Sequence, residues 1–465
     1  MNPLLQGQGL PPFADIHPEQ VVPAITELLS QVNAELTQLE ANLIPTWAGL
    51  VEPLDRLTER IGWSWSIVGH LMGVKNSPEL RTAYEQMQPQ VVQFWMRLGQ
   101  STALYQGYKA INASPEWVTF DPAQKRIIEA AIRDMELSGV GLTGEAKQRF
   151  NDIQLALSEI TTKFSNNVLD ATKAYSLILT TPEEIAGLPV SLLGQAAQSA
   201  RAAGHEAATP TDGPWVITLD APSYIPFMQH SQRRDLREQV YKALVSRAAS
   251  GEYNNLGNID RILELRREMS NLLGFANFAE LSLASKMAPN VAAVESLLES
   301  LRSASFDAAK QDLEDLRAFA ISTGATAAND LNHWDIAYWS ERLREAKFDF
   351  NAEELRPYFP LEQVLSGLFN LAQKLFGITI TAADGQAPIW NPDVRYFQVT
   401  NEQQQPIAYF YLDPYSRPAE KRGGAWMADC VNRAKLTDVD GSKVRLPIAY
   451  LICNQTPPVD SKPSL

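Results

Sequence analysis

Apolar residues recur at intervals of three and four along much of the chain, which is the spacing of helices that bury one side. Between residues 146 and 180 this stripe predicts one long helix. Its apolar positions are Phe150, Ile153, Leu157, Ile160, Phe164 and Val168. Residues 291–321 repeat the pattern, and we expect a second long helix that is buried along one side. Its positions are Val294, Leu297, Leu298, Leu301, Phe306, Leu313, Leu316 and Phe319.

Strand patterns are few, and most of them lie late in the chain. Residues 394–399 and 407–412 are rich in aromatic and β-branched side chains and flank a polar stretch, which predicts a hairpin. Residues 448–453 form a third strand candidate, which we interpret as an apolar, uncharged edge strand. A smaller pairing is expected between 175–179 and 215–219. The patterns together predict a mainly helical protein with a small sheet.

Composition narrows the choice of partners and compartment. The 465 residues include 40 Lys and Arg against 54 Asp and Glu, a net charge of −14, which disfavours nucleic acid and anionic membranes as partners. Because the first basic residue is Arg56, we expect no secretory or transit signal, and no apolar run reaches membrane-spanning length. Two cysteines in so long a chain favour a reducing compartment. The cytoplasm is the expected location.

The histidines offer no local metal motif. They are His17, His70, His205, His230 and His333, and no two of them have the spacing of ligands on one helix. The sequence H-E-x-x-H does not occur. A zinc site would have to be assembled from distant segments, so we expect each histidine to be hydrogen-bonded in a structural role.

Two glycine-containing motifs invite a functional interpretation. Residues 139–144 read G-V-G-L-T-G, but the segment before them has helical spacing, whereas a dinucleotide site requires a strand there. We therefore interpret them as a helix–helix connection. Residues 421–426 read K-R-G-G-A-W, and we favour a close backbone approach at a strand-to-loop transition over direct contact with substrate. Cys430 has no histidine nearby in sequence, which disfavours nucleophilic catalysis.

Long blocks of the chain, in order, resemble the thimet oligopeptidase and oligopeptidase A family of zinc metallopeptidases. The blocks include VKNSPELR (74–81), SNNVLDAT (165–172), LDAPSYIPFM (219–228), LLGFANFAELSLASKMA (272–288), WDIAYWSERLR (334–344) and KRGGAWM (421–427). The resemblance implies a two-lobed helical scaffold with a small sheet near a peptide channel. It also implies an N-terminal helical domain at 1–150, a long helix and connector at 151–222, and an incomplete peptidase domain at 223–465.

The family resemblance also implies an activity, which is hydrolysis of short unfolded peptides. In the family, zinc is held by an H-E-x-x-H helix and a further glutamate, and that helix is expected beyond the last resembling segment, 406–465. No catalytic or metal residue can be carried over to this chain, so we expect no bound zinc and no activity of the chain alone. We predict that Gly423, Gly424, Ala425, Tyr450 and Ile452 line the substrate cleft.

Three functional hypotheses follow from this resemblance. The chain is an interrupted oligopeptidase, or the scaffold half of a split enzyme whose second polypeptide carries H-E-x-x-H, or a non-catalytic helical peptide-binding protein. In the second hypothesis, residues 448–453 would form part of the interface between the two polypeptides. Short peptides are the expected ligands in all three.

Overall fold

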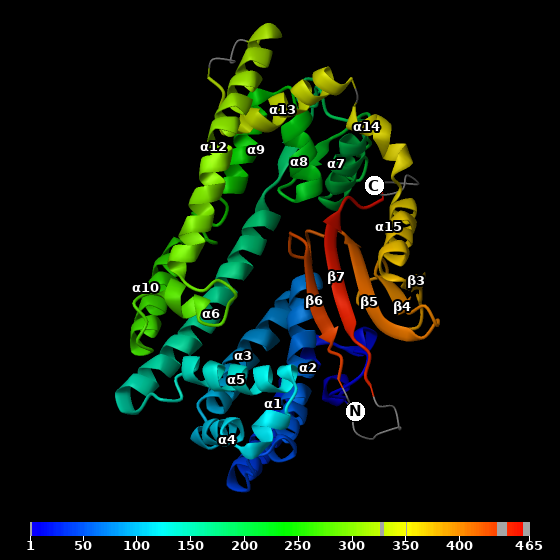
Figure 1. Ribbon diagram of the computed structural model, residues 1–465. Helices are drawn as coiled ribbons and strands as arrows, with labels where there is room; N and C mark the ends of the chain where they lie inside the picture. The colour runs from blue at the N-terminus through cyan, green and yellow to red at the C-terminus, as the bar shows by residue number, and fades with distance from the viewer. Residues whose placement is uncertain (1, 326–329, 350, 435–443, 459–465) are drawn as a thin grey trace. The chain divides into compact units, whose positions relative to one another are not determined.

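The computed structural model describes residues 2–325, 330–349, 351–434 and 444–458. It divides into two compact units, of which unit 1 comprises Met1–Asn166 with Asn255–Ser300, and unit 2 comprises Asn167–Asn254 with Leu301–Leu465. Helices dominate and strands are concentrated late in the chain (Figure 1), which confirms the predicted mainly helical class with a small sheet.

Unit 1 is built from helices and short helical turns. The helices are α1 (Val21–Ala41), α2 (Glu52–Val74), α3 (Pro78–Gly99), α4 (Thr102–Asn112), α5 (Pro122–Leu137), the first part of α6 (Gly144–Ala174), α10 (Leu256–Leu272), α11 (Phe278–Leu283) and the start of α12 (Val291–Ser322). The short turns are η1 (Pro3–Leu5), η2 (Phe13–Asp15), η3 (Pro18–Gln20), η4 (Trp47–Val51) and η5 (Pro115–Thr119). Side chains that cap the first turn determine where several of these helices begin. Ser77 accepts a hydrogen bond from the Leu80 amide at 3.2 Å, and Pro78 follows it in the first turn of α3.

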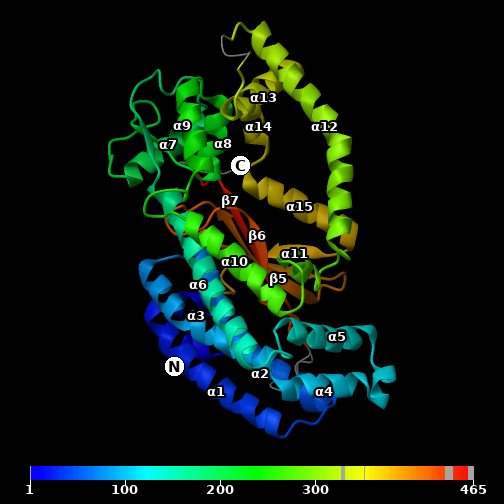
Figure 2. The ribbon, with the colours of Figure 1, turned by 90° about the vertical axis from the view of Figure 1, so that its left-hand side faces the viewer.

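The long helix predicted between residues 146 and 180 is confirmed as α6. Its residues Phe150 and Ile153 are buried against Leu265 and Met269 of α10, which lies along the first half of α6 (Figure 2). The G-V-G-L-T-G motif connects α5 to α6, so the helix–helix interpretation is confirmed. A dinucleotide site is excluded there, because the element before the glycines is a helix rather than a strand.

The second long helix is confirmed as α12, but the predicted burial of its apolar stripe is wrong over much of its length. Leu297, Leu298, Leu301 and Phe306 keep 61%, 59%, 58% and 48% of their surface exposed. On the described part of α12, only Leu316 and Ala320 are buried. Apolar spacing reveals which face of a helix needs a partner, but it does not reveal where that partner comes from.

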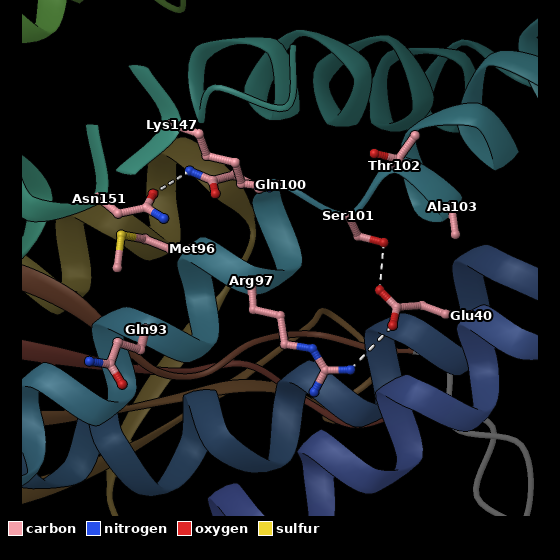
Figure 3. A pocket seen from close by; sticks show the side chains of 10 residues that line it. All are labelled: Glu40, Gln93, Met96, Arg97, Gln100, Ser101, Thr102, Ala103, Lys147 and Asn151. Atoms are coloured by element: carbon pink, nitrogen blue, oxygen red, sulfur yellow. Dashed lines mark hydrogen bonds and ion pairs between the residues drawn. The ribbon is translucent and has the colours of Figure 1, made fainter. Parts of the chain in front are cut away.

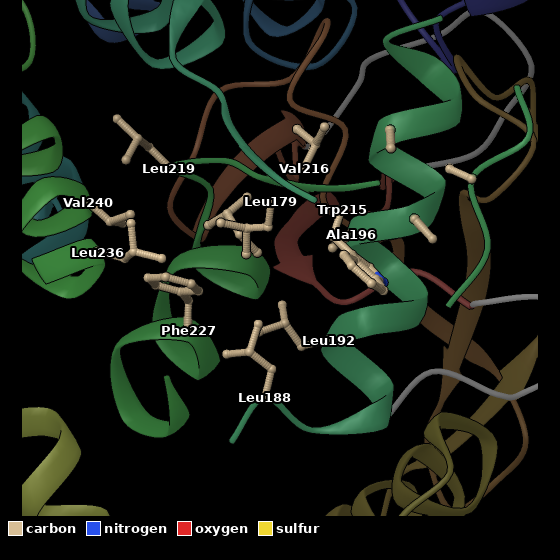
Figure 4. Packing of buried hydrophobic residues seen from close by; sticks show 14 of the residues in the cluster. Leu179, Leu188, Leu192, Ala196, Trp215, Val216, Leu219, Phe227, Leu236 and Val240 are labelled. Atoms are coloured by element: carbon tan, nitrogen blue, oxygen red, sulfur yellow. The ribbon is translucent and has the colours of Figure 1, made fainter. Parts of the chain in front are cut away.

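Unit 2 combines helices with two sheets. Its helices are α7 (Val190–Ala202), α8 (Ala221–His230), α9 (Arg234–Val245), α13 (His333–Phe348), α14 (Ala352–Leu355), the turn η6 (Arg356–Tyr358) and α15 (Leu361–Phe376). Strands β1 (Leu177–Leu179) and β2 (Trp215–Ile217) form the smaller pairing that was predicted, and the pair is antiparallel. They cover a core with α7, α8 and α9 that includes Leu192, Trp215, Phe227 and Val240 (Figure 4).

The larger sheet has five strands in the order β3-β4-β5-β7-β6. The strands are β3 (Thr379–Ala382), β4 (Arg395–Thr400), β5 (Pro406–Tyr415), β6 (Trp426–Val431) and β7 (Ile448–Gln455). The predicted hairpin is confirmed by the antiparallel pair β4–β5. Strand β7 exists as predicted, but it is not an edge. It pairs parallel with β5 on one side and antiparallel with β6 on the other (Figure 1). Strand β6, which follows β5 in the chain, thus occupies the side of β7 that was expected to be open.

Helix α15 packs on one face of this sheet. Leu365 contacts Phe397 and Leu412, and the ring of Phe369 meets that of Phe397 edge-on at 5.1 Å between centroids. Gly377, in the left-handed conformation with φ +67°, ends the helix. The opposite side of α15 is apolar and exposed. Its residues are Val364, Leu368, Leu371, Leu375 and Phe376.

Candidate functional site

The edge of the larger sheet is the strongest candidate for a binding site. Strand β6 is terminal in the strand order of the described residues. In an antiparallel pair, alternate backbone groups of an edge strand point away from the sheet and can pair with another extended chain. Met427, near the start of β6, keeps 78% of its surface exposed, and Ala428 and Asp429 are also exposed. The edge is therefore accessible over half of the strand.

A short turn leads into this edge strand. Gly423, Gly424 and Ala425 are exposed, and Gly424 has a φ of +89°, which favours glycine. Asn454 of β7 donates from its side-chain amide to the backbone carbonyl of Arg422 at 3.1 Å and to that of Gly424. The turn therefore lies at the accessible end of β6 and is anchored to β7.

The other two predicted cleft residues lie inside the sheet rather than at its edge. Tyr450 and Ile452 are buried on β7. The ring of Tyr450 packs against Trp390 at 5.7 Å and against Tyr411 at 5.9 Å. The structure thus brings the three turn residues together at the edge, while Tyr450 and Ile452 support the strand next to it. Whether any of the five contacts a substrate stays a prediction.

A buried ion cluster lies at the end of β5, beside the turn. Asp413 accepts hydrogen bonds from Arg417 at 2.7 and 2.8 Å, from Lys421 at 2.8 Å and from the indole of Trp390 at 3.0 Å. Arg417 also donates to Glu420 at 2.9 Å. Burial alone would raise the pKa of Asp413, but the bonds from Arg417 and Lys421 outweigh it and hold that pKa below its usual range.

Sequence reasoning missed Lys421 and Asp413. In the motif K-R-G-G, only the two glycines indicate a role when the sequence is taken alone. A usable signal was present in Pro414, which follows Asp413 within strand β5 and cannot donate to a ladder. A proline so close to the end of a predicted strand indicates an irregular place, where the ladder lacks one backbone donor.

Cys430 is not a nucleophile candidate. It is buried on β6, and burial raises the pKa of its thiol to about 12. Near neutral pH the thiol is therefore protonated, whereas the thiolate is the reactive form. The sequence-based expectation that nucleophilic catalysis lacks support agrees with this environment.

Three of the five histidines have structural surroundings. His230 pairs through Nδ1 with the Arg342 guanidinium at 3.0 Å, and His333 stacks on Tyr241 at 5.9 Å between ring centroids. His70 is buried with its ring 5.6 Å from that of Phe13. Across residues 2–325, 330–349, 351–434 and 444–458, no group of three His, Cys, Asp or Glu side chains could hold a metal ion. The donor set of these residues does not fit a zinc centre.

Unit 1 contains a polar pocket of about 560 Å³ between α1, α3, α4 and α6 (Figure 3). Its polar side chains bond one another: Ser101 donates to Glu40 at 2.5 Å, and the Gln100 amide donates to Asn151 at 2.7 Å. Arg97 forms an ion pair with Glu40 at 3.2 Å. These bonds join the four helices, and we interpret the pocket as a structural junction.

Comparison with known proteins finds two family models in this chain. The model described as "Peptidase family M3" matches residues 227–465, and the model "Neurolysin/Thimet oligopeptidase, N-terminal domain" matches residues 25–147. The first therefore covers just over half of the chain, including both sheet edges and the buried ion cluster. The second covers most of unit 1.

Three curated relatives align with the whole chain. They are "Organellar oligopeptidase A, chloroplastic/mitochondrial" of Arabidopsis thaliana at 53% identity, "Probable cytosolic oligopeptidase A" of the same plant at 52%, and "Oligopeptidase A" of Escherichia coli K12 at 40%. The chain spans 58%, 66% and 67% of their respective lengths.

Proposed function

The chain belongs to peptidase family M3, and from this membership we propose that it is the scaffold part of an oligopeptidase A-type zinc metallopeptidase for short unfolded peptides. The observation that supports this proposal best is identity of 40–53% along the entire chain with three oligopeptidases A. Similarity of this extent preserves the fold, but activity depends on the residues of the site.

The task we propose for the described residues is to hold the peptide. An extended peptide would add to the sheet beside β6, pairing with its outward backbone groups, and the turn at residues 423–425 would lie beside one end of it. Backbone pairing tolerates different side chains, which suits an enzyme for varied short peptides. The net charge of −14 would mildly favour cationic peptides.

We further propose that this polypeptide alone does not cleave peptides. Its 465 residues contain no H-E-x-x-H, and the described donor set does not fit zinc, so no step of hydrolysis is assigned to a metal on this chain. The test combines zinc content by mass spectrometry with cleavage of a quenched fluorescent peptide. We expect less than stoichiometric zinc and no turnover. Turnover that a chelator abolishes would refute the proposal.

A second candidate, the scaffold half of a split enzyme, is favoured by the exposed apolar side of α15. A continuous apolar patch is typical of a surface that another polypeptide covers. Strand β7 is internal, so the expectation that residues 448–453 form an edge strand is wrong, and we move the proposed interface to α15. The partner would be a polypeptide that carries H-E-x-x-H.

Co-expression tests this second candidate. The chain is produced with a polypeptide that corresponds to the part of the cytosolic plant relative outside the aligned region. A stable complex with chelator-sensitive peptide cleavage supports a split enzyme. Peptide binding without complex formation supports the non-catalytic peptide-binding protein instead.

The cytoplasm is the location we propose. Cys430 and Cys453 are both free thiols, which fits a reducing compartment. In the described part of the chain, no helix is both long and apolar enough to cross a bilayer. The plant relatives carry a cytosolic and an organellar name, so fractionation of the host cell is the direct test.

A further inference from the structure

We propose that Lys421 is a positioning residue, which fixes the turn at residues 423–425 and thereby the start of edge strand β6 in the geometry that receives a peptide. The inference rests on the proposed function, because it assumes that β6 pairs with a peptide. It adds a specific residue to that function, and this residue lies behind the edge and would not touch the peptide itself.

The ammonium of Lys421 is surrounded by oxygens from two neighbouring strands. It donates to the carbonyls of Asp413 at 3.2 Å, Tyr415 at 2.7 Å and Cys453 at 2.5 Å, and to the Asp413 carboxylate at 2.8 Å. Its side chain is 0% exposed. Lysine has three N–H donors, and here all of them have oxygen partners within hydrogen-bond distance.

These carbonyls surround a defect in the sheet. The parallel register of β5 and β7 shifts between Asp413 and Tyr415, and Pro414, which lies between them, has no backbone N–H. A register shift and a proline interrupt the regular ladder, and buried carbonyls at such a place need donors. Lys421 supplies these donors, so its position is determined by β5 and β7 together.

The residues that follow Lys421 in the chain form the turn at 423–425. Asn454, which lies at the same irregularity on β7, donates to the carbonyls of Arg422 and Gly424. The Arg422 guanidinium lies 4.2 Å from the centre of the Trp426 ring, at the first residue of β6. The two glycines between them have no side chains to pack. Lys421 and Asn454 are thus the anchors that determine where β6 begins.

The test compares two buried cations in the full 465-residue chain. Lys421→Met removes the ammonium from Asp413 but leaves Arg417 on that carboxylate. Arg237→Met is the matched control, because Arg237 also pairs with a buried carboxylate at 2.8 Å, that of Asp335, and Arg234 remains on it. Both variants lose a buried ion pair, but only the first alters the anchor of the turn.

Binding of a fluorescein-labelled nine-residue peptide is measured by anisotropy, and protection of β6 amides by hydrogen–deuterium exchange with and without the peptide. We expect Arg237→Met to match the wild type in affinity and in peptide-induced protection. Lys421→Met should bind about tenfold more weakly, since the peptide must then order the turn, and should lose the protection of β6. A merely structural role would lower the melting temperature of both variants alike without separating their affinities.

The outcomes distinguish the two proposals. If the wild type binds and protects β6 while Lys421→Met does the same within twofold, the role of Lys421 is overturned and the peptide-holding function stands. If the wild type binds no peptide, the peptide-holding function fails and the role of Lys421 fails with it. Should Lys421→Met not fold, Asn454→Ala is measured instead, and wild-type affinity in that variant also overturns the positioning role.

Discussion

Replacing Asp413 by asparagine should destabilise the sheet by about 3 kcal/mol. The carboxylate is fully buried, and three groups donate to it: Arg417, Lys421 and the indole of Trp390. Asparagine keeps one acceptor oxygen, but its amide group then faces donors. Removing one partner of a buried ion pair costs about 3–5 kcal/mol. We expect the lower end, because Glu420 still accepts from Arg417.

The assay follows local opening rather than one global transition, because two compact units can unfold separately. Hydrogen exchange is measured in peptides that contain β5 and β7. A loss of about 3 kcal/mol in the free energy of opening corresponds to exchange about a hundredfold faster, because β5 and β7 are expected to re-close faster than their open amides exchange.

Asp384→Asn is the matched control on the same sheet. Asp384 accepts from the Arg395 guanidinium at 2.8 Å and from the Tyr396 amide at 2.8 Å, but 43% of its side chain is exposed. An exposed pair contributes about 0–1 kcal/mol, so little change is expected. If Asp413→Asn opens β5 and β7 no faster than Asp384→Asn does, the reasoning about the buried cluster is refuted.

Three further predictions concern acid, the core and the exposed side of α15. Asp413 and Asp335 have folded-state pKa values below their usual range, so the stabilisation that they provide is present above about pH 4 and is lost as pH falls through those lower values. The melting temperature measured between pH 5 and pH 2 should show this loss. A melting temperature that does not change over that range would contradict it. Phe227→Ala should destabilise by about 3–5 kcal/mol, because Phe227 is completely buried. Phe376→Ala, at a side chain that is 73% exposed, should change the melting temperature little. If Phe227→Ala and Phe376→Ala lowered the melting temperature equally, this assignment of the core would be contradicted. Leu371→Lys should leave the melting temperature within about 2 °C of the wild type and lower the binding of an exposed-hydrophobe dye, since Leu371 lies on the open side of α15.

Local pattern was sufficient for most individual elements. The stripes that begin at Phe150 and Val294 correctly predict α6 and α12, because helical spacing depends only on nearby residues. The hairpin β4–β5 was also predictable, since its polar connection is short. The same information failed for the burial of Leu297, because the surroundings of a helix face are set by distant segments.

The candidate site required long-range information in the same way. The sequence identifies residues 448–453 as a strand, but the order β5-β7-β6 is decided by pairing between segments far apart in the chain. The glycines of the turn were recognisable from their composition. The role of Lys421 was not recognisable, because a lysine is expected on the surface unless the structure shows the carbonyls near Pro414 that accept its hydrogen bonds.

The internal position of β7 has a consequence for synthesis on the ribosome. Strand β7 is made after both of its neighbours, yet it must enter between them. While residues 448–455 are still inside the ribosome, the nascent chain can pair β3, β4 and β5, but β5 keeps an unpaired edge and β6 has no neighbour to join. Exposed strand edges on incomplete chains invite association with other chains. The sheet can therefore be completed only after β7 has left the ribosome, and nascent chains halted before β7 would expose the unpaired edge of β5 to chaperones and to other chains.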